Sequence, residues 1–292
     1  MYAKKKHQEY VLRILFVTFF ILLLTGCNSG IIAALKGQDC ESDWLDEGLN
    51  RNQCDFHRRN YSDFNFSRQE MKDVNFKGSD LTGADFSRAN LEKSVFMGSE
   101  MSNSKLHAAN LRATNFNSAD LRNADLRSAD LTGAFLSYAD LQEADLTWCD
   151  LDNATLRETN LFNANLRGVE LNQSDLRGAN LNSANLNGAK LVSSNLSDAD
   201  ISNAYLSGVD LSNAILMRSN LSGTLLVMTD LSGANLAGAN FRGAKLQRAK
   251  LHAADLSAAD LTQAELQGVH YNSQTRWPDG FDPNAAGAIL DD

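Results

Sequence analysis

The chain has 292 residues, a formal net charge of -9 and 22% charged residues. Such an acidic protein repels the phosphate backbone, which argues against duplex nucleic acid as a partner. Only two prolines occur, Pro278 and Pro283, and both lie close to the C-terminal end. Because proline has no backbone N–H to donate, the long proline-free stretch predicts regular structure that uses its backbone hydrogen bonds throughout.

Residues 1–27 have the pattern of an export signal. A basic stretch is followed by the apolar run 14–24, which is shorter than the roughly 20 residues of a membrane-spanning helix. The following Leu24-Thr25-Gly26-Cys27 resembles a bacterial lipobox, and the resemblance implies a signal peptide that ends at Cys27, with lipid such as palmitate attached there. Two alternatives stay open, an uncleaved anchor and an ordinary signal peptide in which Cys27 is incidental.

The lipobox resemblance also implies a location. We expect a protein tethered to a membrane of the bacterial cell envelope through the lipid on Cys27. Asn28 follows the cysteine, where aspartate commonly marks retention in the inner membrane of bacteria with two membranes. The resemblance therefore favours the periplasmic side of the outer membrane, an inference that lapses if the host has a single membrane.

From Phe56 to Tyr271, every fifth residue is large and apolar, and no insertion shifts this register. A fixed period of five excludes a helix, whose apolar positions recur at three and four. The residue two places before each large one is usually small, and residues two apart in a strand face the same side. Each unit of five is therefore predicted to be a short strand with two inward side chains, followed by a two-residue corner.

The spacing of the phenylalanines predicts how many units close one coil. Phe56, Phe76 and Phe96 are separated by 20 residues, and so are Phe66 and Phe86 at an offset of ten. In a four-sided coil of 20 residues these side chains form two stacks on opposite walls, whereas a 15-residue coil would scatter them. Four sides are the better interpretation.

At this point the sequence resembles the pentapeptide-repeat family. The resemblance covers residues 54–271 and is carried by units such as Ala119-Asp120-Leu121, Ala129-Asp130-Leu131 and Ala179-Asn180-Leu181. It implies an all-β fold, a right-handed quadrilateral β-helix, and the length predicts about eleven coils in a single solenoid.

Both ends of a solenoid must be covered, since open ends expose unpaired strand edges. Residues 28–53 lack the repeat and are expected to form an N-terminal cap or linker. A disulfide between Cys40 and Cys54 would close it in an oxidising compartment, although Cys54 also fits a simple buried position. Cys149 lies at a small inward position, so a buried free thiol is expected.

Residues 272–292 are expected to form a C-terminal cap and tail, which resembles the segment that closes many pentapeptide-repeat solenoids. Trp277 and Phe281 can cover the last coil, while the two prolines stop further strand pairing. A ligand-binding loop is the alternative interpretation.

No motif for catalysis, metal binding or cofactor binding is evident. The five histidines do not cluster with one another or with cysteines at metal-ligand spacing, and no phosphate-binding glycine loop occurs. Aspartate and asparagine alternate at one outward position, which is typical of a solvated face. We therefore expect no enzyme, and nominate no catalytic residue, metal or cofactor.

The outward positions, taken as columns of spacing 20, predict two special surfaces. One column, Asp80, Glu100, Asp120 and Asp140, forms an acidic strip whose like charges repel unless cations screen them. Elsewhere, apolar residues gather where polar ones are usual, and we take them as a candidate protein-contact patch. The patch comprises Tyr205, Leu225, Val227 and Met228. Harmless drift on a tolerant solenoid is the alternative.

The function expected from these patterns is a lipid-anchored protein-interaction scaffold that binds an unknown protein or associates with itself. Some cytosolic members of the pentapeptide-repeat family are acidic rods that resemble DNA and bind a type II topoisomerase. The acidic strip fits that alternative, but the export signal argues against it. An envelope enzyme is a second alternative, which no motif supports.

Overall fold

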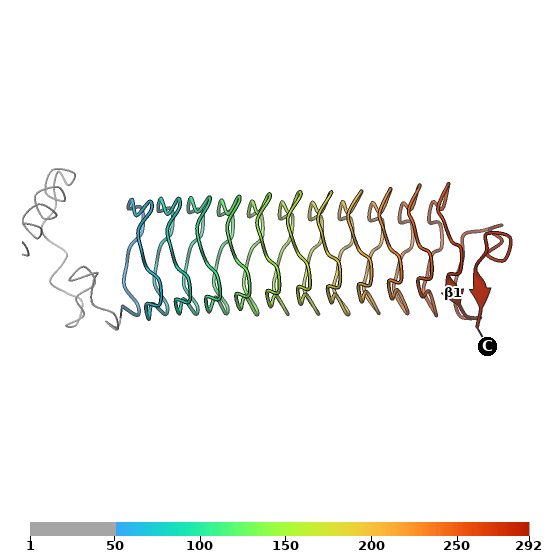
Figure 1. Cartoon of the computed structure of the whole chain (residues 1–292), viewed down its shortest axis with the longest axis horizontal. Helices are drawn as coiled ribbons and strands as arrows, with labels where there is room; N and C mark the ends of the chain where they lie inside the picture. The colour runs from blue at the N-terminus through green and yellow to red at the C-terminus, as the bar shows by residue number, and fades with distance from the viewer. Residues whose placement is uncertain (1–50, 292) are drawn as a thin grey trace, which may run out of the picture. The chain divides into compact units, whose positions relative to one another are not determined.

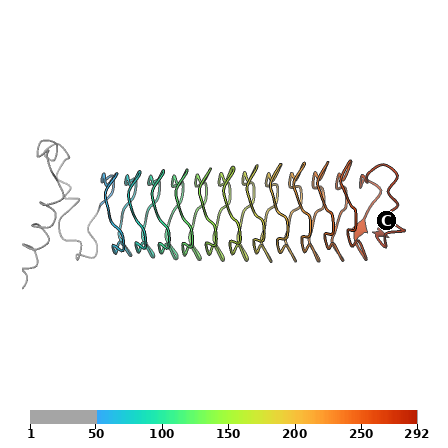
Figure 2. The same cartoon turned by 90° about the horizontal axis from the view of Figure 1, so that it is seen from above.

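The structure, a computed structural model, describes residues 51–291. These residues form a rod of stacked coils that ascends from one end to the other along the sequence (Figure 1). Seen after a quarter turn, the stack has a similar outline, as a coil with four equal sides should (Figure 2). No helix within the described part is long and apolar enough to cross a membrane.

Each coil contains 20 residues. Parallel bridges join Asp125 to Asp145 and Asp145 to Asn165, and the same step of 20 recurs at every fifth residue, so that one coil has four walls. The coil length predicted from the phenylalanine spacing is therefore confirmed. Continuous strands are almost absent because each wall contributes a single bridging residue before the chain turns a corner.

The core is a continuous column of the large and small inward side chains. Phe76 is fully buried, and its ring stacks on Phe56 at a centroid distance of 5.0 Å and on Phe96 at 5.1 Å. On the facing side Phe66 and Phe86 stack at 4.7 Å, with ring planes only 5° apart. The two phenylalanine stacks predicted from the sequence are both present.

The aspartate or asparagine of each unit has a backbone role that the sequence analysis missed. In the unit 144–148, four N–H groups donate to backbone carbonyls, three of them in neighbouring coils. The remaining N–H, that of Thr147 at the corner, donates to Oδ1 of Asp145 at 3.0 Å. Interpreting this position only as a solvated face was therefore incomplete, because the side chain satisfies a corner donor that no carbonyl reaches.

Where the wall residue lacks such an oxygen, an asparagine one coil earlier can replace it. Tyr205 occupies a wall position, and the N–H of Ser207 donates to Oδ1 of Asn187 at 3.0 Å. The same replacement occurs at Phe135, where the N–H of Ser137 donates to Oδ1 of Asn117 at 2.9 Å. The corner N–H therefore remains hydrogen-bonded where Tyr205 or Phe135 occupies the wall position.

The regular coil begins earlier than the sequence predicted. Arg51 lies fully buried at a large inward position, and Nη1 donates to the buried Gln69 Oε1 at 2.6 Å. The sequence analysis placed the boundary at residue 54, and the Arg51 guanidinium has a hydrogen-bond acceptor inside the coil. Residues 51–53 consequently belong to the solenoid and not to the preceding cap.

Two short strands close the C-terminal end of the rod. Strand β1 (His270–Tyr271) pairs in parallel with β2 (Ile289–Leu290), in a register that sets His270 opposite Ile289. Between them, the Trp277 ring meets Tyr271 edge-on at 5.4 Å, and Phe281 stacks on Trp277 at 5.2 Å. Both rings pack against the hydrophobic core, in the covering position expected for them.

The last strand is held by a histidine–aspartate cluster. Asp291 accepts from His252 Nε2 at 2.8 Å and lies 3.1 Å from His270 Nδ1. The hydrogen bond from His270, followed by that from His252, lowers the pKa of the Asp291 carboxyl. Because a depressed carboxyl pKa stabilises the folded state only while the group is ionised, this contribution is present above the ordinary carboxyl pKa and is lost as pH falls through the lower folded value.

We therefore expect β2 to loosen in acid before the rest of the rod does. Amide hydrogen exchange at Ile289 should accelerate below about pH 4 relative to the central coils. In the variant Asp291→Asn this acid-dependent step should be missing, with faster exchange at Ile289 already at neutral pH. An unchanged pH profile in that variant would contradict the assignment to Asp291.

Candidate interaction face

One wall of the rod carries both charged and apolar side chains in blocks, and we call it the Tyr205 wall. Its residues are linked by successive parallel bridges: Asn65, Asp85, Lys105, Asp125, Asp145, Asn165, Asn185, Tyr205, Leu225, Lys245 and Glu265.

Three consecutive coils of this wall, together with the two corners that flank it, lack any charged side chain; we call this area the neutral face. It comprises Asn182, Ser183, Asn185, Asn187, Gly188, Ser202, Asn203, Tyr205, Ser207, Gly208, Ser222, Gly223, Leu225, Val227 and Met228. Because 22% of the chain is charged, so large an uncharged area stands out from the surrounding walls.

The structure brings the four residues of the candidate contact patch together on the neutral face. Tyr205 and Leu225 are bridge partners in adjacent coils, and Val227 and Met228 form the corner that follows Leu225. Tyr205 is 47% exposed and Met228 61%, while Leu225 and Val227 are half-buried. The patch is therefore contiguous in space, as an interaction site requires.

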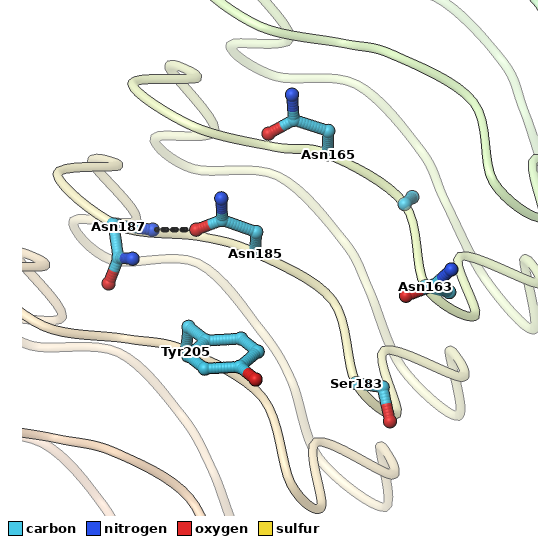
Figure 3. Close-up of a pocket in the computed structure, with 7 residues that line it drawn as sticks. Asn163, Asn165, Ser183, Asn185, Asn187 and Tyr205 are labelled. Atoms are coloured by element: carbon cyan, nitrogen blue, oxygen red, sulfur yellow. Dashed lines mark hydrogen bonds between the residues drawn. The ribbon is translucent and has the colours of Figure 1, made fainter.

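A shallow depression lies beside Tyr205 at the start of the neutral face. It is lined mainly by amide and hydroxyl side chains of three coils and is bounded by the tyrosine ring (Figure 3). The N–H of Asn187 donates to Asn185 Oδ1 at 3.2 Å, which leaves the Asn185 amide group pointing outward. The hollow can accept a protruding ring or a polar group, but it contains no charge.

The sequence analysis overlooked Trp148, whose side chain is 63% exposed at the corner beside the Tyr205 wall. The same corner position one, two and three coils later is occupied by Gly168, Gly188 and Gly208, and then by Met228. The indole lies over Gly168, where an added Cβ would come within 2.3 Å of the ring. Listing corner residues at intervals of 20, as was done for the walls, would have revealed this column.

The acidic strip has its own counter-ions. The Arg122 guanidinium donates through Nε to Asp120 at 2.8 Å and lies 3.8 Å from the Asp140 carboxylate in the next coil. The hydrogen bond from Arg122 lowers the pKa of the Asp120 carboxyl. The repulsion expected for stacked carboxylates is thus reduced by the protein itself, without added cations.

Cys149 is a buried free thiol, as predicted from its inward position. Its Sγ donates to the Leu126 carbonyl at 2.8 Å, and burial raises the pKa of the thiol to about 12. Since thiolate is the reactive form, we expect Cys149 to resist iodoacetamide in the native rod at pH 8 and to react once the rod is unfolded. Mass spectrometry of the Cys149 peptide before and after denaturation measures this, and native-state alkylation would contradict it.

The remaining predicted site residues are not brought into this face. Cys27 and Cys40 lie outside the described residues, so lipidation and the Cys40–Cys54 pairing stay predictions; Cys54 itself is buried in the first coils. Among residues 51–291, no group of histidine, cysteine and carboxylate side chains is placed to hold a metal ion.

Comparison with known proteins identifies the repeat. The profile for a pentapeptide repeat region matches residues 69–146. The profile for pentapeptide repeats in eight copies matches residues 139–178, 154–198, 194–233, 214–252 and 225–263. No curated protein matches the chain.

Among solved structures, the chain is 31% identical to HetL, a pentapeptide repeat protein involved in heterocyst differentiation regulation from the cyanobacterium Nostoc sp. strain PCC 7120. That alignment covers 75% of this chain and 91% of HetL, with a TM-score of 0.31. A pentapeptide repeat protein from the cyanobacterium Cyanothece 51142, Rfr23, is 32% identical over 37% of this chain and 90% of its own, with a TM-score of 0.21.

A more distant likeness is to QnrB1, a plasmid-mediated fluoroquinolone resistance protein. It is 17% identical over 84% of this chain and 91% of its own, with a TM-score of 0.26. The two repeat profiles and the 31% identity to HetL show that the chain belongs to the pentapeptide-repeat family.

Proposed function

We propose that this chain is an exported lipoprotein whose repeat rod serves as a protein-interaction scaffold at a bacterial envelope membrane, anchored by lipid on Cys27. The observation that carries the proposal is the neutral face, where exposed Tyr205 and Met228 lie on three coils without charge. Contiguous apolar surface with a polar rim is typical of a contact site.

The architecture we propose for the scaffold is a right-handed quadrilateral β-helix of about eleven coils, which at the usual strand spacing makes a rod of roughly 50 Å. Its parts are the signal peptide 1–27, the cap or linker 28–53, the solenoid 54–271 with residues 51–53 added, and the C-terminal cap and tail 272–292.

Metabolic labelling with a fatty acid tests the anchor. The wild-type chain should incorporate label and sediment with membranes, whereas Cys27→Ala should do neither, because the acceptor sulfur is gone. Label in the alanine variant, or an unlabelled wild-type chain, would overturn the lipoprotein part of the proposal while leaving the scaffold part standing.

A matched pair of substitutions tests the interaction face. Leu225→Asp combined with Val227→Asp places charges in the neutral face and should abolish capture of the partner by the tagged full chain. Ile215→Asp makes the same kind of change on the opposite wall, where Ile215 is 37% exposed, and should leave capture unchanged. Equal capture by all three proteins would remove the face from the proposal.

The alternative of a rod that imitates DNA gains no support from the walls. The acidic strip from Asp80 to Asp140 continues with Asn160 and Asn180, and arginines pair with carboxylates on other walls. Asp175, for example, lies between Arg157 at 2.6 Å and Arg177 at 2.7 Å.

A further inference from the structure

We propose that the neutral face binds a second copy of this chain, with the two rods face to face and antiparallel and the two-fold axis passing at Asn185. This rests on the proposed function, because it names the partner of the same face. In this arrangement, residues an equal number of coils before and after Asn185 meet across the interface.

Both lysines of the Tyr205 wall are matched with carboxylates about that axis, while Asp85 lies outside the matched range. Lys105 and Glu265 lie four coils to either side of Asn185, and Asp125 and Lys245 lie three coils to either side. In an antiparallel pair, each lysine therefore faces a carboxylate of the other copy. The two-fold axis repeats both contacts, so four ion pairs lie on either side of the neutral face.

The two lysines in question lack partners within the rod. On the neighbouring wall Lys190 pairs with Glu170 at 2.8 Å, and Lys250 lies 3.4 Å from Asp230. Lys105 and Lys245 are exposed, and no ion pair within residues 51–291 involves them. The Tyr205 wall therefore presents two cations that a second copy can neutralise, although Asp125 of that copy already pairs with its own Arg127 at 2.7 Å.

The corner residues from Trp148 to Met228, spaced by 20, are related by the same two-fold axis. Rotation about an axis that crosses the rod keeps each corner on its own side, so the corner beside one Tyr205 wall meets the same corner of the other copy. Trp148 then faces Met228, Gly168 faces Gly208, and Gly188 faces its own counterpart. Gly188 permits close backbone approach at the axis, whereas Gly168 is covered by the Trp148 ring of its own copy, and the thioether can contact that indole at either end.

The depression of Figure 3 fits this register as well. Asn165 and Tyr205 lie one coil to either side of Asn185, so the ring of one copy's Tyr205 is directed at the hollow lined by Asn163 and Asn165 in the other. A tyrosine ring fills such a hollow with apolar area, and its hydroxyl finds amide partners there. The two copies exchange this contact reciprocally.

Other ways of joining two such walls are less favourable. Parallel rods set Lys105 against Lys105 and Asp125 against Asp125, which is repulsive at every charged position. An antiparallel axis placed between Tyr205 and Leu225 joins the apolar residues but leaves Lys245 opposite an asparagine, which desolvates the cation without a counter-ion.

The proposed register has several imperfect contacts, among them the exposed Arg167, which faces Ser207, and Glu143, which faces Gly223. Asp145 faces Leu225, but its carboxylate already accepts hydrogen bonds from Thr147 and Asn165 in its own rod. Arg122 faces Arg242 along the other corner. Each is already matched internally, Arg122 by Asp120 and Arg242 by Asp260 at 3.5 Å.

A charge exchange in the full-length chain, purified in detergent, tests the pairing. Lys105→Glu and Glu265→Lys should each weaken dimerisation by roughly tenfold or more, because each replaces two attractions with two repulsions. The double variant, which restores opposite charges in swapped order, should dimerise as the wild-type chain does. Neither residue caps a corner, so the fold should survive, and the rescue separates pairing from misfolding.

Cysteine cross-linking tests the register. Asn185→Cys should form disulfide-linked dimers on oxidation, since only residues on the axis meet their own copies. Asn195→Cys, on the opposite wall, is the matched control. It should form no more disulfide-linked dimer on oxidation than the wild-type chain does. Asn165→Cys should cross-link with Tyr205→Cys in a mixture.

Several outcomes would overturn the proposal. They are a monomeric wild-type chain, a double charge variant as weak as the single ones, or cross-linking of Tyr205→Cys with Leu225→Cys in place of Asn185→Cys. If a different protein is captured in a way that Leu225→Asp with Val227→Asp abolishes, while the wild-type chain remains monomeric, the scaffold function stands and self-association fails.

Discussion

Phe76→Ala should destabilise the N-terminal coils by about 3–5 kcal/mol, the range for truncating a fully buried phenylalanine. The ring stacks between Phe56 and Phe96, so its loss leaves a cavity inside a closed coil and breaks two aromatic contacts. Because each coil contacts only its neighbours, the damage should be local. Hydrogen exchange should accelerate first around residues 56–96, ahead of the C-terminal coils.

The control is Phe162→Ala, which removes the same atoms from a corner where the ring is 37% exposed. It leaves no enclosed cavity, so we expect a loss of under about 1 kcal/mol in the free energy of unfolding. Comparable losses in the two variants would show that the phenylalanine stack is not what stabilises the first coils.

Ala234→Leu should have a similarly large effect by the opposite mechanism. Ala234 is only 1% exposed, and Ala214 and Ala254 occupy the same inward position in the coils before and after it. The larger side chain has no space there and must displace the backbone of a bonded coil, which costs about 1–3 kcal/mol or more. Denaturant unfolding monitored by circular dichroism would measure the change.

Ala237→Leu makes the identical change three residues later, at a half-exposed corner of the same unit. Its side chain extends into solvent, and we expect a shift within about 0.5 kcal/mol. If Ala237→Leu destabilised the rod as much as Ala234→Leu, then the assignment of inward and outward positions would be wrong for this coil.

The period of the sequence was enough to predict the coil, because every large apolar position is constrained by the same closed core. Phe56, Phe76 and Phe96 determine the length of a coil by their spacing alone, and the bridges confirm it. Arg51 was missed because its buried guanidinium donates to Gln69, a polar side chain that lies in the next coil. The period of apolar residues does not indicate a buried pair of polar side chains.

The polar side chains were harder to interpret from the sequence. The bond from Thr147 N–H to Asp145 follows from the corner geometry, which an alternation of aspartate and asparagine does not by itself indicate. That Tyr205 and Leu225 are neighbours could be predicted because walls can be tabulated at intervals of 20, and the two residues are bridge partners. Trp148 and its glycines were missed because corners were not tabulated in the same way.

The uniform 20-residue coil also restricts how the rod can change length. Deleting one whole coil, such as residues 140–159, leaves all later residues facing their former directions and merely shortens the rod. Deleting a single unit of five instead rotates everything downstream by a quarter turn, which moves Tyr205 away from the side that carries Asn165. The fold should therefore tolerate natural insertions and deletions whose length is any multiple of five residues. A surface that spans several coils should survive only those whose length is a multiple of 20.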